Sequence, residues 1–291
     1  MSVDRVATAH QSAFFLAQVN QAGVRLDTTN KQIASGVVAD TYAGFGDKAQ
    51  VLQATLSAQA RNSAYTTATG LAVTQADLQD TQLTSLSDLA AQLKKAVSGA
   101  VANNDPTGLM ATVDSVFSQA VSISSLSQLI AAPSTASIFT NGDAKKAVQV
   151  ADGQSISFGV TASDAGTSLM QALKDIATFD AGSSGSFNTS TNLSGAQTSF
   201  LTAQIATTDT VAAGLTAITA QNGNVYNQLQ AATAQQGASD TLYKGFVDKI
   251  QNTNMAEAAT QLSLNQTALQ AALQVTATLN QLTLLNYLPN K

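Results

Sequence analysis

The side chains that usually carry catalytic or metal chemistry are scarce in this chain of 291 residues. It contains one histidine, His10, and no cysteine. Zinc clusters and the common nucleophile–base arrangements need several such residues, so they cannot be assembled within one chain. The aspartates are scattered and show no calcium-loop spacing, which leaves only serine–lysine or carboxylate chemistry open. We therefore expect no enzyme activity, no metal site and no cofactor.

Two further patterns argue against phosphate and nucleic-acid binding. Gly44 and Gly46 lack the third glycine and the preceding strand of a dinucleotide-binding loop. The net charge is −5 and the pI is about 4.6. The only adjacent basic pairs are Lys94-Lys95 and Lys145-Lys146, whereas binding to nucleic acid needs clustered lysine and arginine. We expect no nucleic-acid partner.

The most informative segment is the C-terminal one, which carries no charged side chain from Ala258 to Asn290. Glutamine, asparagine, serine and threonine interrupt its apolar residues. No apolar run approaches the roughly 18 residues that a membrane span needs, so no membrane span is predicted. The pattern favours a coiled-coil or packed-filament helix that other protein helices bury. A single core helix of a globular domain is the alternative.

Apolar residues at helical spacing near both chain ends indicate which side chains this burial would use. The C-terminal stripe also contains Asn265 and Thr276, and further leucines lie off it, so more than one face of this helix is apolar. The candidate interface residues are Phe15, Val19, Ala22, Leu26, Ile33, Met255, Leu262, Leu269, Leu273, Leu279 and Leu282.

The remaining chain is predicted to be mainly α-helical, because its three prolines, Pro106, Pro133 and Pro289, leave long stretches free to form continuous helix. One helix is expected from Val3 to Ala34. A second runs from Lys48 to Gly99, and a third, from Leu109 to Ile130, should lie antiparallel to it after a short turn.

Beyond Pro133 the pattern changes. Apolar and polar residues alternate around Asp152-Gly153, which predicts a β-hairpin, and a short helix should follow. Residues 180–195 have the composition of a surface loop. Helical spacing resumes near Ala196, with a break expected at 235–237 and a final helix beginning at Ser239 or Asp240.

These elements suggest three parts. Residues 1–34 and 239–291 would form a terminal coiled coil of antiparallel helices. Residues 35–133 and 196–238 would form a helical bundle, and residues 134–195 a small mixed α+β insert that contains the hairpin.

Three segments resemble the bacterial flagellin and hook-associated protein family. They are Gln32-Ile33-Ala34-Ser35-Gly36, Asp152 to Val160 (DGQSISFGV), and Gln261 to Leu288 (QLSLNQTALQAALQVTATLNQLTLLNYL), whose Leu-Leu-Asn-Tyr-Leu ending is most similar to hook–filament junction proteins. Members of the family often carry an Asp-Asp pair soon after the Ser-Gly. Here that loop reads ADTYAGFGD, from Ala39 to Asp47.

The resemblance implies a structural subunit of the flagellar axis, either a junction protein or a flagellin. It implies a homo-oligomer in a helical tube, with hook-associated protein 1, flagellin and an export chaperone as partners. It also implies an extracellular location reached without a cleaved signal peptide, and Phe14-Phe15-Leu16 is too short for a secretory signal. A third class, an unrelated helical adaptor or secreted effector, remains open.

Overall fold

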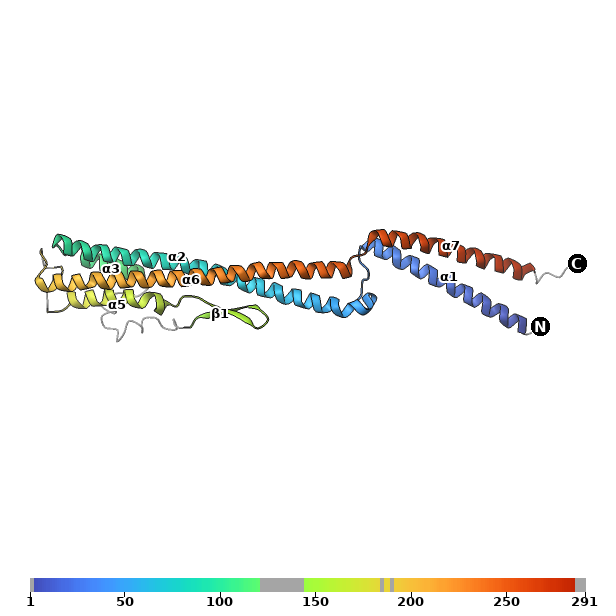
Figure 1. The fold of residues 1–291 in the computed structure, drawn as a ribbon, viewed down its shortest axis with the longest axis horizontal. Helices are drawn as coiled ribbons and strands as arrows, with labels where there is room; N and C mark the ends of the chain where they lie inside the picture. Colours follow the sequence, from blue (N-terminus) through green and yellow to red (C-terminus); the bar gives the residue numbers. More distant parts are fainter. Residues whose placement is uncertain (1–2, 121–143, 184–185, 189–190, 286–291) are drawn as a thin grey trace. The chain divides into compact units, whose positions relative to one another are not determined.

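The computed structural model describes residues 3–120, 144–183, 186–188 and 191–285, with only the backbone for residues 3–9, 11–12 and 279–285 (Figure 1). The chain forms two compact units. One comprises residues 1–60 and 239–291, and the other residues 61–238. The predicted mainly α-helical class with one small β-hairpin is confirmed for the part of the chain that is described.

Long helices dominate the described chain, which also has one 3-10 helix, η1, and two strands. In order, the elements are α1 (Val3–Ser35), η1 (Tyr42–Lys48), α2 (Ala49–Asn103), α3 (Leu109–Ala120), β1 (Lys146–Ala151), β2 (Gln154–Phe158), α5 (Ala162–Asp180), α6 (Gly195–Gln251) and α7 (Met255–Leu285). The helix predicted to reach Ile130 is described as far as Ala120, and its remainder lies outside the described residues.

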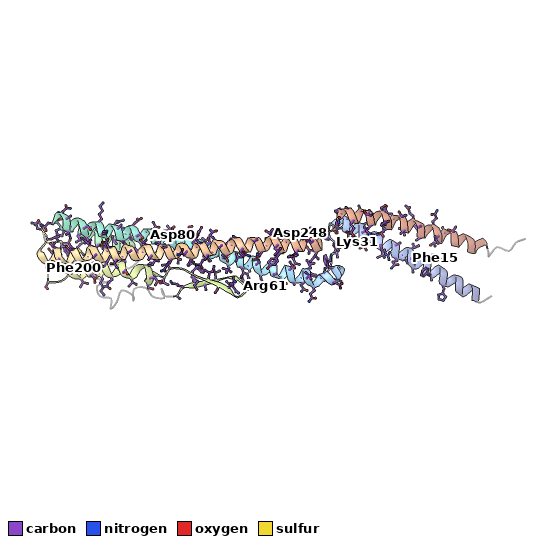
Figure 2. All side chains as sticks on the ribbon, in the orientation of Figure 1. Phe15, Lys31, Arg61, Asp80, Phe200 and Asp248 are labelled. Carbon is purple, nitrogen blue, oxygen red and sulfur yellow. The ribbon has the colours of Figure 1, made fainter. Side chains whose placement is uncertain are left out.

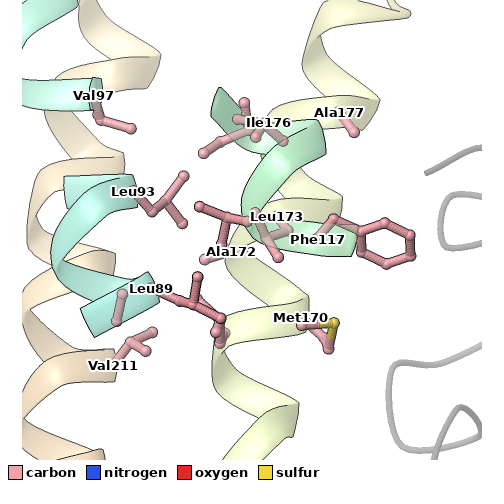
Figure 3. Close-up of a cluster of buried hydrophobic side chains, with 14 of the residues drawn as sticks. Leu89, Leu93, Val97, Phe117, Met170, Ala172, Leu173, Ile176, Ala177 and Val211 are labelled. Atoms are coloured by element: carbon pink, nitrogen blue, oxygen red, sulfur yellow. The ribbon is translucent and has the colours of Figure 1, made fainter. Parts of the chain in front are cut away.

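The unit formed by residues 61–238 has an apolar core between four helices. Figure 3 shows its centre, where Leu93 of α2, Phe117 of α3, Leu173 of α5 and Val211 of α6 belong to one buried cluster. Each such side chain contributes roughly 1.5–3 kcal/mol when it is fully buried. The helical spacing of the apolar residues in α2 and α5 therefore produces a core that holds this unit together.

The predicted β-hairpin is present, and it packs on α2 and α6. Its strands pair antiparallel with Val148 opposite Ile156, and Gly153 adopts a φ of 72° in the turn, a conformation that glycine permits without strain. The hairpin's buried side chains, Val148, Val150 and Phe158, form a second cluster with helix residues Ala72, Ala76 and Leu229.

The helix break expected at 235–237 is wrong, because α6 continues to Gln251. Gln236 is only 3% exposed, and its Nε2 donates to Thr69 Oγ1 at 3.0 Å and to the Val150 carbonyl at 2.8 Å. Asn62 Nδ2 donates to the Gln236 carbonyl at 2.8 Å. These bonds stabilise the helix against the roughly 1 kcal/mol that Gly237 costs within it. The final helix consequently begins at Met255 rather than at Ser239 or Asp240.

The loop between α5 and α6 is less exposed than its polar composition suggests. Phe187 is 1% exposed, and its ring stacks on Phe179, which in turn stacks on Phe200 of α6. The backbone N–H of Phe187 donates to Asp180 Oδ1 at 2.7 Å. The loop is therefore attached to the bundle by one aromatic anchor.

Candidate assembly interface

The N-terminal helix presents the predicted stripe to its partner helix. Within the unit of residues 1–60 and 239–291, α1 and α7 lie side by side and antiparallel (Figure 1). Figure 2 labels Phe15 and Lys31 on α1. The α1 members of the candidate set are all half-buried, at Phe15, Val19, Ala22, Leu26 and Ile33. The helix also exposes large apolar side chains, namely Phe14, Leu16 and Val24.

The C-terminal helix brings only part of its predicted set to this contact. Leu262 and Leu269 are half-buried in a stripe that continues through Ala258, Asn265, Ala272 and Thr276. Met255 and Leu273 are about half exposed, at 50% and 51%, so the α1–α7 pair does not bury them. The side chains of Leu279 and Leu282 lie outside the described residues.

The two stripes have the spacing of a coiled coil. Buried positions recur at alternating steps of three and four residues on both helices, so that each helix keeps one seam towards the other. Among the described residues, the Asn265 amide makes the polar contacts across the seam: its Nδ2 donates to Thr29 Oγ1 at 3.0 Å and to the Arg25 carbonyl at 3.5 Å. Sequence spacing placed Asn265 in the stripe, but nothing in the sequence identified Thr29 as its partner.

The connections at the base of this helix pair are hydrogen-bonded to each other. Val38 N–H donates to the Gln251 carbonyl at 2.7 Å, and Thr253 N–H donates to the Gly36 carbonyl at 2.9 Å. Gly36 takes a φ of 73°, the left-handed conformation that commonly ends a helix. Asn254 Oδ1 accepts from Ala256 N–H at 3.2 Å, which caps the start of α7.

Charge plays a small part in the contact between the two helices. Asp27 and Lys31 pair at 2.8 Å on the exposed side of α1, and the hydrogen bond and charge of Asp27 raise the pKa of Lys31. An exposed pair of this kind contributes little to stability. Glu257 in the first turn is the only charged residue of α7. The pairing therefore depends on apolar packing and on uncharged polar groups.

Sequence reasoning missed the extent to which α7 stays uncovered. Leu264, Leu273 and Val275 are 59%, 51% and 44% exposed. They lie off the seam that faces α1. The sequence predicted Leu273 as an interface residue but did not single out Leu264 or Val275. Leu264 and Val275 share one side of the helix, because they are eleven residues, or about three turns, apart. Leu273 lies about two and a half turns from Leu264 and is therefore on the opposite flank of the seam. We call Leu264 and Val275 the outer face of α7.

The described residues bring no chemical centre together. No three histidine, cysteine, aspartate or glutamate side chains in the described ranges group closely enough to hold a metal ion. His10 is exposed on α1. None of the helices described combines the length and hydropathy that crossing a bilayer requires.

Residues 205–288 match the sequence profile of the bacterial flagellin C-terminal helical region. This stretch covers most of α6 and all of α7, including the seam residues and the outer face. No curated protein matches the chain at a significant level.

Proposed function

We propose that the chain is a structural subunit of the flagellar axis and that its specific role is that of a hook–filament junction protein. The match of residues 205–288 to the bacterial flagellin C-terminal helical region supports the axial role. In this role a few copies join the end of the hook to the filament. The chain would act by assembling rather than by catalysing a reaction.

The observation that carries the proposal is the outer face of α7. One side of the helix packs on α1, while Leu264, Leu273 and Val275 remain exposed in the single chain. Burying a leucine that is about half exposed contributes on the order of 1 kcal/mol, so several such residues in each of several copies make assembly favourable. Neighbouring copies of the terminal helices are the partner that fits an uncharged apolar helix.

This arrangement supports an inner tube made of terminal helices. Residues 1–34 and 239–291 would form that inner coiled coil, with the interface set of the sequence prediction as its contacts. Residues 35–133 and 196–238 would form the next shell, and the insert of residues 134–195 would face outward. Leu269, Leu279 and Leu282 would then contribute within the same tube.

One feature favours a junction protein over a flagellin. The Gln261 to Leu288 segment is most similar to junction proteins of the family. Flagellin, the filament subunit, is the second candidate, because the matched profile is that of the flagellin C-terminal region. A junction protein would contact hook-associated protein 1 on one side and flagellin on the other. An export chaperone would carry it to the cell exterior without a cleaved signal peptide.

Deletion of the gene separates the two roles. Loss of a junction protein should release flagellin into the medium while hooks remain on the cells, and re-expression of the chain should restore filaments. Loss of a flagellin should instead remove filament protein from both cells and medium. Cells that keep normal filaments after the deletion would contradict both candidates.

A further inference from the structure

We infer that the hydrogen bond between Asn265 and Thr29 fixes the register in which α7 pairs with α1. This inference concerns contacts within one chain and does not depend on the junction role. The bond is the polar contact observed across a seam whose other described positions are mostly alanine, leucine, valine and isoleucine.

The geometry gives the pair a defined position. Thr29 is 6% exposed, more buried than the apolar members of its own stripe. Its hydroxyl donates to the Arg25 carbonyl at 2.9 Å and accepts from Asn265 Nδ2 at 3.0 Å. Asn265 Nδ2 also lies 3.5 Å from the Arg25 carbonyl. Two acceptors on one turn of α1 therefore receive one amide from α7.

The apolar residues cannot select this register by themselves. Leu262 and Leu269 are one heptad apart, as are Val19, Leu26 and Ile33, so sliding α7 by seven residues again places apolar residues opposite each other. Charge cannot select it either, since Glu257 is the only charged residue of α7. Sliding by one heptad would place Asn265 opposite Ala22 or Gly36, where no side chain can accept its hydrogen bond.

An amide left without a partner in the seam penalises the slipped register. Asn265 is half-buried, so the loss of its hydrogen bond corresponds to a change of roughly two- to tenfold in the ratio of the two registers. A single polar residue at a core position is known to specify register in coiled coils in this way. Asn265 and Thr29 are positioning residues in this sense, because they align the apolar contacts.

The absence of cysteine from the chain makes the register measurable. In an antiparallel pair, moving forward along α7 means moving back along α1. The register that places Asn265 beside Thr29 therefore also places Leu269, four residues later on α7, beside Leu26, three residues earlier on α1. A Leu26→Cys, Leu269→Cys variant should therefore form a disulfide in the native register. In the native register the two cysteines of a Leu26→Cys, Leu262→Cys variant would be offset by about 10 Å along the helices, beyond the reach of a disulfide. This variant should therefore form a disulfide only after α7 slips by one heptad.

Both cysteine pairs are introduced into the dilute full-length monomer, with and without Thr29→Val and Asn265→Leu, and oxidised. Removing both polar groups should raise the slipped cross-link by roughly two- to tenfold relative to the native one. Thr276→Val is the matched control, because Thr276 is half-buried in the same stripe but its hydroxyl donates to Ala272 of its own helix at 2.8 Å. This control should leave the ratio unchanged.

Three results would overturn the inference. They are an unchanged ratio after removal of Thr29 and Asn265 polarity, an equal change with Thr276→Val, and failure of the native cysteine pair to form in the parent chain. Because the cross-links form within a monomer, they are independent of whether the protein assembles. A correct register without assembly would contradict the proposed function and leave the register inference standing.

Discussion

Replacing Leu269 with aspartate tests whether assembly requires the pairing of α1 with α7. Leu269 is half-buried in that seam, so removing it forfeits on the order of 1 kcal/mol of apolar burial. The new carboxylate loses part of its hydration at this half-buried position, which adds a desolvation cost on the order of 1 kcal/mol. Together these effects should weaken pairing of the two helices by roughly 10- to 100-fold.

The core of residues 61–238 should be unaffected, because Leu93, Leu173 and the rest of its buried cluster lie in the other unit. The assay is pelleting of the full-length variant with flagellar fragments, together with thermal unfolding followed by circular dichroism. We expect loss of pelleting and an unchanged main unfolding transition.

Gln270→Asp is the matched control. It introduces the same charge one residue along α7, at an exposed position next to the polar residues Gln266 and Gln274. It should assemble normally. Normal pelleting of Leu269→Asp, or equal loss with Gln270→Asp, would refute the reasoning that assembly requires the α1–α7 pair.

Three further predictions concern the rest of the fold. Gln236→Ala removes the amide that bonds Thr69 and Val150 and should cost about 1–3 kcal/mol, lowering Tm by several degrees, whereas the exposed neighbour Gln235→Ala should change it little. Phe187→Ala should lower the free energy of unfolding, measured by chemical denaturation, by about 3–5 kcal/mol, because it removes the loop's aromatic anchor. Equal stability of Phe187→Ala and the exposed control Asn188→Ala would show that the anchor is unimportant. Hydrogen bonds from Lys244 and Gln59 hold the pKa of Asp240 below its ordinary value of 3.8. These bonds to the ionised carboxylate therefore stabilise the folded chain above pH 3.8, and the stabilisation is lost as the pH falls through the lower pKa of the folded state. Asp240→Asn should flatten that part of a plot of urea midpoint against pH, and an unchanged plot would contradict the assignment.

Local patterns in the sequence were enough to predict much of this fold. Helical spacing identified α1, α2 and α5, and alternation around Asp152-Gly153 identified the hairpin. The same spacing selected the half-buried face of α1. These features depend on periodicity and turn residues, which lie close together in the chain.

The errors came from contacts between distant residues. Gly237 marks a plausible helix break locally, but Gln236 bonds residues of α2 and β1 that the sequence does not place nearby. Phe187 is surrounded by polar loop residues and is buried by Phe179. Met255 and Leu273 are apolar but exposed, because the seam with α1 covers only one face of α7.

The location of the protein on intact flagella tests the central claim most directly. Gold-labelled antibody against the insert of residues 134–195 should bind, in electron micrographs, at one short band between hook and filament. Label along the whole filament would show that the chain is the flagellin instead. Absence of label from flagella whose cells express the protein would contradict its assignment as an axial subunit.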